Sequence, residues 1–207
     1  MKILNIISSP KLEQLRMFVE VHGQKVKVKE DQLYLSGMQI EDFTQIKGLE
    51  KLLELKSLIL FNNNISSIKN LNTLTKLEKL NLYGNQIKEI SGLDHLIKLK
   101  TLYLSDNQIT EIKGLDQLEQ LENLSFENNK IKKIEGLNQL KKIKKINLHG
   151  NLITTIEGLV NLKNLEELRI GDNPIPNEVL EKCGGIDEKG YAYDPQRFVK
   201  QYKKIGD

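Results

Sequence analysis

The chain contains 207 residues, of which 39% are hydrophobic and 29% charged, and its formal net charge is +3. This composition is typical of a folded protein with an ordinary core, and so small a net charge argues against a general nucleic-acid-binding protein. Because no apolar run approaches about 18 residues, the sequence predicts no membrane-spanning helix. The apolar stretch at the N-terminus is cut off by Ser8, Ser9 and Pro10 and is too short for a signal peptide, so we expect the mature chain to begin at Met1.

The only cysteine, Cys183, excludes an internal disulfide and is consistent with a reducing compartment, so we expect a cytoplasmic protein. No pairing of Cys183 with a histidine is evident, and we interpret it as a packing residue rather than a nucleophile. The sequence contains no cluster with metal-ligand spacing and no glycine-rich phosphate loop. We therefore predict neither a metal site nor a cofactor.

Residues 1–30 are expected to cap the N-terminal end of the fold. Ser9 followed by Pro10 is typical of a helix start, and Gly23 of a helix end. The apolar face of this predicted helix consists of Leu12, Leu15, Phe18 and Val19. The segment QKVKVKED, which begins at Gln24, then alternates like an edge strand.

Residues 31–175 repeat themselves with a period of 22 residues. The stretch LEKLNLYGNQIKEISGL from Leu77 returns as LKTLYLSDNQITEIKGL from Leu99, LENLSFENNKIKKIEGL from Leu121 and IKKINLHGNLITTIEGL from Ile143. One more shift in each direction gives LKSLILFNNNISSIKNL from Leu55 and LEELRIGDNPI from Leu165. A degraded first copy, DQLYLSGMQI, is followed by a segment three residues longer. About seven copies in phase predict a solenoid.

Each repeat combines two periodicities. Around Leu80 and Leu82 the apolar residues alternate, which predicts a short strand. From Ile87 the apolar residues then fall three apart, which favours a tight return path with three residues per turn over a full α-helix. One coil per repeat would therefore stack these strands into a parallel sheet.

One asparagine recurs in six of the copies, and Met38 takes its place in the degraded first copy. A strand that ends by turning inward leaves backbone groups without partners, and a side-chain amide can both donate to them and accept from them. We therefore expect a ladder of buried structural asparagines at Asn63, Asn85, Asn107, Asn129, Asn151 and Asn173.

Residues 176–207 are expected to form a helical C-terminal cap. A short helix is predicted from Pro176 to Cys183, ended by Gly184. A second helix is predicted to begin at Asp194 and Pro195. Its apolar face consists of Phe198, Tyr202 and Ile205.

The pattern L-x-x-L-x-L-x-x-N-x-I-x-x-I-x-x-L over residues 33–175 resembles the 22-residue subclass of leucine-rich repeats. This subclass is typified by a regulatory subunit of protein phosphatase 1 and by bacterial internalins. The resemblance implies an α/β fold in a single domain: a right-handed curved solenoid whose concave parallel sheet binds another protein. By the same analogy, a regulator of a phosphatase or of a GTPase is an alternative. The closing segment from Asn177 differs from the phosphatase regulator's usual C-terminal cap.

Apolar side chains gather at outward strand positions of four consecutive copies: Tyr34, Ile59, Phe61, Tyr83 and Tyr103. Neighbouring strands lie about 4.8 Å apart, so these side chains would form one patch. They could stabilise the sheet by pairing across strands, or they could anchor a partner. We favour a binding site, because the C-terminal half of the same surface is formed without aromatic residues, with Ser125 and Asn147 for example.

Glu127, His149 and Arg169 occupy outward positions of three further copies. A carboxylate, an imidazole and a guanidinium on adjacent strands could in principle perform acid–base chemistry. However, no outward serine or cysteine is clearly placed as a nucleophile, and an open sheet excludes little water. We therefore predict a non-enzymatic module in which these three residues add charge selectivity for the partner.

A lysine-rich stretch is expected on the convex side: Lys130, Lys132, Lys133, Lys141, Lys142, Lys144 and Lys145. It raises the alternative of a nucleic-acid-associated scaffold. No aromatic residue is interleaved with these lysines, and lysine is common on solvated faces, so we do not expect direct nucleic-acid binding. The expected partner is another protein. We expect a monomer, although the sequence leaves self-association open.

Overall fold

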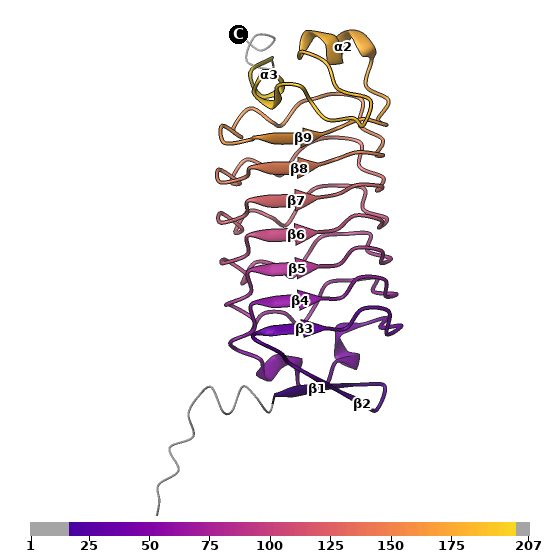
Figure 1. Cartoon of the computed structure of the whole chain (residues 1–207), viewed down its shortest axis with the longest axis vertical. Helices are drawn as coiled ribbons and strands as arrows, with labels where there is room; N and C mark the ends of the chain where they lie inside the picture. Colours follow the sequence, from indigo (N-terminus) through magenta and orange to yellow (C-terminus); the bar gives the residue numbers. More distant parts are fainter. Residues whose placement is uncertain (1–16, 202–207) are drawn as a thin grey trace, which may run out of the picture.

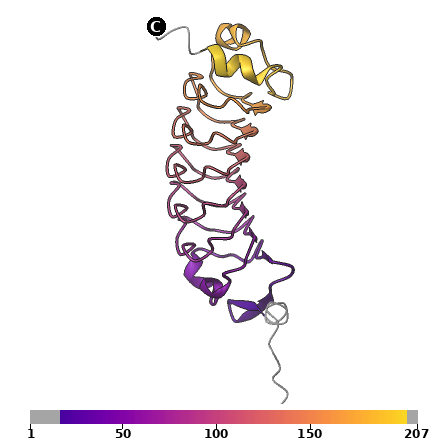
Figure 2. The same ribbon diagram turned by 90° about the vertical axis from the view of Figure 1, so that its left-hand side faces the viewer.

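The structure, a computed structural model, describes residues 17–201 as an elongated curved solenoid (Figure 1). Its main sheet has seven parallel strands in chain order: β3 (Gln32–Tyr34), β4 (Ser57–Ile59), β5 (Lys79–Asn81), β6 (Thr101–Tyr103), β7 (Asn123–Ser125), β8 (Lys145–Asn147) and β9 (Glu167–Arg169). Each strand pairs in register with the next repeat, so that Leu80 lies opposite Leu102. The sheet lines the concave side of the curve (Figure 2). The predicted solenoid with a concave parallel sheet is confirmed.

The core runs along the axis of the solenoid, because every repeat contributes the same apolar positions to it. Leu80 and Leu82 are fully buried, and the return-path residues behind them are buried as well. The N–H of Leu96 donates to the carbonyl of Leu93 at 2.9 Å, which confirms the predicted spacing of three residues. Short 3-10 helices η1 (Phe43–Gln45) and η2 (Leu49–Lys51) occur in the longer first return.

The ladder asparagines form hydrogen bonds that join consecutive repeats; five of them are buried, whereas Asn173, which was expected to be buried too, is only half-buried. The Oδ1 atom of Asn107 accepts from the N–H of Ile87 at 2.9 Å. Its Nδ2 atom donates to the carbonyl of Leu82 at 2.9 Å and, within its own repeat, to that of Leu104 at 3.1 Å. Each side-chain amide thus forms hydrogen bonds with backbone groups of the preceding coil. Met38 needs no amide, because it belongs to the first coil of the stack.

The position before each ladder asparagine has a left-handed backbone. The residues are Asn62, Gly84, Asp106, Asn128, Gly150 and Asp172, with φ between 52° and 65°. Glycine, asparagine and aspartate are the residues that tolerate this conformation best. The recurrence of these three residue types before each ladder asparagine marks the left-handed position in the sequence.

The N-terminal end is closed by a β-hairpin of β1 (Phe18–Val21) and β2 (Gln24–Lys27). His22 and Gly23 form its turn with φ of 49° and 79°, as a two-residue hairpin turn requires. The prediction of a helix through Phe18 and Val19 is therefore wrong. Valines at every second position bury one side of the hairpin and favour strands. The predicted edge strand is confirmed as β2, whereas Ser9 to Leu15 lie outside the described residues.

The C-terminal end carries the two predicted helices, α2 (Asn177–Lys182) and α3 (Pro195–Gln201). The Asp194 carboxylate caps α3 by accepting from the N–H of Gln196 at 3.0 Å. Phe198 and Cys183 are buried as predicted, and Tyr202 and Ile205 lie outside the described residues.

The segment between α2 and α3 adds a feature that the sequence did not predict. Residues 190–192 run antiparallel to β9: the N–H of Ala192 donates to Leu168, and that of Ile170 donates to the carbonyl of Gly190, both at 2.8 Å. These bonds cover the last edge of the sheet.

Candidate binding face on the concave sheet

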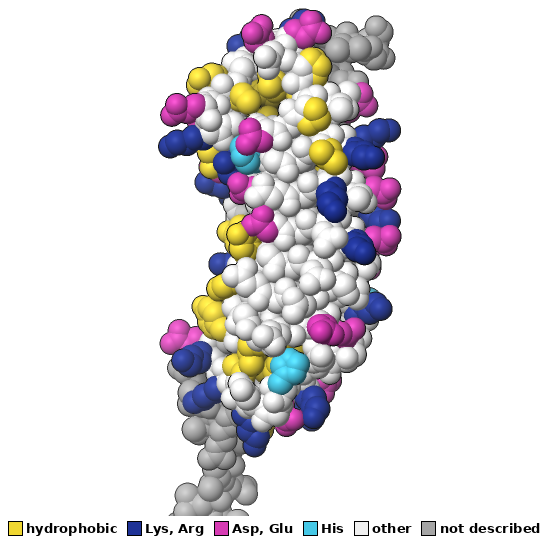
Figure 3. Space-filling view, turned by 90° about the vertical axis from the view of Figure 1, so that its right-hand side faces the viewer, with side chains coloured by type: hydrophobic (Ala, Val, Ile, Leu, Met, Phe, Trp, Pro, Cys, Tyr) yellow, Lys and Arg dark blue, Asp and Glu magenta, His cyan; other side chains and the backbone are white. Residues whose placement is uncertain are grey.

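The concave sheet exposes aromatic rings at its N-terminal half. Tyr34 lies on β3, and Phe61 and Tyr83 follow the ends of β4 and β5; their exposed fractions are 55%, 38% and 41%. Apolar side chains are visible along the hollow of the molecule (Figure 3). Together with Tyr103, these residues are called the aromatic face below.

The structure corrects one member of the predicted patch. Ile59 has only 6% of its surface exposed, so the expectation of an exposed side chain is wrong. It lies in register between Tyr34 and Asn81, in the middle of the paired strands, where neighbouring side chains cover it. Tyr103 is half-buried, and the Nζ atom of Lys79 lies 5.6 Å from the centre of its ring.

A carboxylate lies beside the Tyr83 hydroxyl. The hydroxyl of Tyr83 is hydrogen-bonded to Asp106, and this bond raises the pKa of Tyr83 above its usual value. Asp106 belongs to the row of left-handed residues and also accepts from Asn128 at 2.8 Å. The apolar pattern in the sequence did not indicate Asp106, which lies beyond the end of β6 at a left-handed position, or Lys79, which is the first residue of β5.

In the polar, C-terminal half of the concave sheet, the charged side chains form ion pairs and hydrogen bonds within the chain. Nη1 of Arg169 donates to Oε1 of Glu127 at 2.6 Å, and Nδ2 of Asn147 donates to the other carboxylate oxygen at 2.9 Å. Nε of Arg169 also donates to the carbonyl of Lys189 at 2.9 Å, and its guanidinium stacks over Tyr191. This network ties the sheet to the C-terminal cap.

His149 does not join Glu127 and Arg169. Its Nε2 atom lies 3.0 Å from the Asp172 carboxylate, while its Nδ1 atom is buried without a hydrogen-bond partner among residues 17–201. The imidazole packs against Gly171 and Gly190. The structure therefore brings together two of the three predicted residues, and neither contact forms a nucleophile–base arrangement.

The lysine-rich stretch does not form one convex patch. Lys145 is the first residue of β8, on the sheet, and pairs with Glu167 at 2.9 Å. Lys144 pairs with Glu122 at 2.9 Å, whereas Lys130 follows the opposite end of a strand, after β7. The expectation of seven lysines on one face is wrong, because a coil of 22 residues carries neighbours in sequence to different sides.

Lys144 belongs instead to a row of alternating charges along the solenoid: Asp31, Lys56, Glu78, Lys100, Glu122 and Lys144. The ion pairs in this row join residues of adjacent coils at 2.8–3.0 Å. Hydrogen bonds from Lys100 and Lys144 lower the pKa values of Glu78 and Glu122, respectively. The row contains as many acidic as basic residues and therefore carries no net charge.

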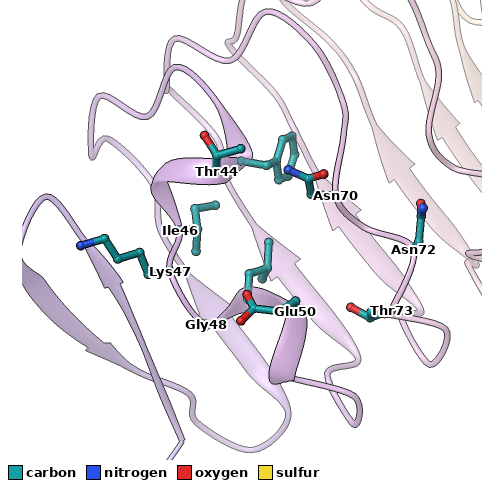
Figure 4. Close-up of a pocket in the computed structure, with 10 residues that line it drawn as sticks. Thr44, Ile46, Lys47, Gly48, Glu50, Asn70, Asn72 and Thr73 are labelled. Atoms are coloured by element: carbon teal, nitrogen blue, oxygen red, sulfur yellow. The ribbon is translucent and has the colours of Figure 1, made fainter.

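Away from the sheet, a depression of 570 Å³ lies between the first two return paths (Figure 4). Its lining includes Phe43, Thr44, Glu50 and Asn70, and Lys47 points away from these side chains (Figure 4).

Over residues 17–201, no three histidine, cysteine or acidic side chains are grouped as metal ligands. In the same part of the chain, no helix is long and apolar enough to cross a membrane.

The sequence and fold are similar to known proteins. A family model described as two copies of leucine-rich repeats matches residues 53–95 and 97–139. The structure of an internalin C2 from Listeria monocytogenes is 30% identical with a TM-score of 0.56, over 70% of this chain and 73% of that one. LIC12759, a leucine-rich repeat protein of Leptospira interrogans, is 32% identical with a TM-score of 0.59, over 69% and 37%.

A TLR13–ssRNA13 complex is 29% identical with a TM-score of 0.56, and the match covers 60% of this chain and 19% of that chain. The comparison with curated proteins found no match. The repeated sequence, the parallel-stranded solenoid and the internalin match together show that this chain belongs to the leucine-rich repeat proteins.

Proposed function

We propose that this chain is a non-catalytic module that binds another protein through the aromatic face of its concave sheet. The observation that carries the proposal is the exposure of Tyr34, Phe61 and Tyr83 on three adjacent coils. Exposed apolar patches of this kind mark interaction sites, and aromatic residues are enriched among the side chains that dominate binding energy.

Stabilisation of the sheet does not require this exposure. Ile59 shows how an apolar residue on the same surface stabilises strands, because neighbouring side chains cover it. Phe61 and Tyr83 instead leave more than a third of their surfaces in water.

The polar half supplies selectivity in this proposal. Because Glu127, Arg169 and His149 have partners within the chain, a bound protein with an unmatched charge there would lose its hydration without gaining an ion pair. A regulatory or scaffolding role of a cytoplasmic monomer is part of the proposal, and the single buried thiol of Cys183 supports its cytoplasmic location. No contact described here favours a phosphatase or a GTPase as the partner.

The test is affinity capture from a cell lysate with the full chain and the double variant Phe61→Ser, Tyr83→Ser. Tyr193→Ser is the matched control, because Tyr193 is 72% exposed but lies in the C-terminal cap. We expect the wild type and the control to retain one protein that the double variant loses while its melting curve is unchanged. Equal retention by all three would contradict the proposal.

A further inference from the structure

The two edges of the seven-stranded sheet differ. At β9, residues 190–192 supply an antiparallel partner. At β3, only Gln32 has an outer partner: it exchanges hydrogen bonds with Lys29 at 2.8 and 2.9 Å, across a turn at Glu30 and Asp31. β2 runs obliquely away from the rest of β3 (Figure 1). The outer side of β3 beyond Gln32 is therefore the edge without a paired strand among residues 17–201.

The repeats show which groups this edge leaves unpaired. In later coils, the carbonyl of the third strand residue accepts from the preceding coil, as Tyr103 does from Leu82 at 2.9 Å. The carbonyl two residues further along also accepts a hydrogen bond from the preceding coil: the carbonyl of Ser105 accepts from the N–H of Gly84 at 3.0 Å. The equivalent residues of the first coil are Tyr34 and Ser36. Within residues 17–201, no backbone N–H donates to either carbonyl.

The amides of Tyr34 and Ser36 also point outward. The N–H groups of Leu35 and Gly37 donate to β4 and the residues after it, at 2.8 and 3.1 Å. Because successive backbone groups of a strand alternate in direction, those of Tyr34 and Ser36 point away from the sheet. The Oγ atom of Ser36 is in addition buried without a partner among the described residues.

Apolar and charged side chains flank this edge. Tyr34 lies on β3 itself and Phe61 follows the adjacent strand β4, and both rings are exposed, so the edge is continuous with the aromatic face. On the hairpin, exposed lysines alternate at Lys25, Lys27 and Lys29. Lys25 lies 4.5 Å from the ring of Phe18, and neither Lys27 nor Lys29 forms an ion pair with a described acidic residue.

The nearby carboxylates do not offset these lysines. Glu20 pairs with Lys47 at 2.9 Å and Asp31 pairs with Lys56 at 3.0 Å. Glu30 remains as one exposed negative charge beside three exposed lysines. The surroundings of the edge are therefore positive, and a negatively charged segment complements them.

We propose that the outer edge of β3 binds an extended, acidic segment of the partner protein, which adds an eighth strand to the sheet. An open strand edge is a template for such an addition, with backbone hydrogen bonds giving affinity and alternate side chains giving specificity. The segment pairs from Tyr34 to Gly37, places apolar side chains beside Tyr34 and Phe61, and places carboxylates near Lys27 and Lys29. This inference rests on the proposed function, because it extends the same interface.

Amide hydrogen exchange of the free full-length chain is the first test. We expect the amides of Tyr34 and Ser36 to exchange much faster than those of Leu35 and Gly37, which are bonded to the next coil. Equal protection at all four positions would show that the chain itself covers this edge and would overturn the inference.

The second test uses three synthetic peptides. One alternates valine with glutamate, the second alternates valine with lysine, and the third is the glutamate peptide N-methylated at alternate backbone amides. We expect the glutamate peptide to bind with protection of the Tyr34 amide, and the other two to bind at least about tenfold more weakly. Equal binding of all three, or no binding at millimolar concentration, would overturn the inference.

Ser36→Pro and Ser36→Ala form a matched pair of variants. Proline removes the outward N–H and blocks an incoming strand, but it breaks no described bond of the sheet. Alanine removes only the hydroxyl. We expect peptide binding to be lost in Ser36→Pro and kept in Ser36→Ala, and Lys27→Glu with Lys29→Glu to weaken it about tenfold. Unchanged binding to Ser36→Pro would contradict strand addition.

Partner capture separates the two proposals. If Ser36→Pro still captures the protein that Phe61→Ser, Tyr83→Ser loses, the aromatic face binds the partner and the edge does not. If both variants lose it and Ser36→Ala retains it, the edge is part of the interface.

Discussion

Arg169 on β9 donates to Glu127, two residues beyond β7, so this ion pair spans the intervening strand β8. The two side chains are 20% and 29% exposed, and Arg169 also binds the carbonyl of Lys189 in the cap. We predict that Arg169→Ala destabilises the chain more than Glu127→Ala, with a coupling energy of about 1 kcal/mol between them. A double-mutant cycle from urea unfolding measures this, and additive effects would contradict it.

The asparagine ladder predicts a second energetic effect. Asn107→Leu would leave the N–H of Ile87 buried without a partner. It would also remove one of the two side-chain amides that donate to each of the carbonyls of Leu82 and Leu104. We expect a loss of roughly 1–3 kcal/mol in the free energy of unfolding. Met38→Asn is the control and should bring little gain, because no coil precedes it. Equal urea midpoints for wild type and Asn107→Leu would refute the structural role of the amide.

The C-terminal cap depends on a contact between two glycines. A Cβ atom at Gly171 would lie 2.5 Å from the Cα atom of Gly190, so Gly171→Ala must displace the segment that covers β9. We expect a destabilisation of roughly 1–3 kcal/mol. We also expect faster hydrogen exchange at the Ala192 amide, which donates to Leu168. Unchanged protection of Ala192 would show that the cap does not need this contact.

The row of alternating charges predicts a pH dependence. Because hydrogen bonds from lysines lower the pKa values of Glu78 and Glu122 from 4.5, their stabilising contribution is complete above that pH. It is lost as the pH falls through the lowered values. The variant Glu78→Gln, Glu122→Gln should therefore show a smaller drop in its urea midpoint between neutral pH and about pH 3 than the wild type. Identical drops would contradict the contribution of these pairs.

Periodicity in the sequence was sufficient to predict the sheet, its register and the asparagine ladder, because these features repeat with every coil. The ends do not repeat, and there the prediction was weaker. Phe18 and Val19 fit a helical face as well as a strand, and the turn at His22 and Gly23 decided between them. The pairing of residues 190–192 with β9 left no periodic signal in the sequence.

The candidate site was predicted in outline, and its side-chain partners were not. Strand alternation placed Tyr34 and Tyr83 on the concave surface, but it could not show that neighbours cover Ile59. His149 contacts Asp172, and Asp172 occupies the left-handed position before a ladder asparagine. That geometry becomes visible only when adjacent coils are stacked.

The most direct test of the aromatic face is photo-cross-linking in living cells with a benzophenone amino acid at position 61. The same amino acid at position 193, in the C-terminal cap, is the control, because Tyr193 is exposed and aromatic as well. We predict one protein adduct at position 61 that is absent at position 193. Adducts at position 193 alone, or none at position 61 in a folded chain, would contradict the account.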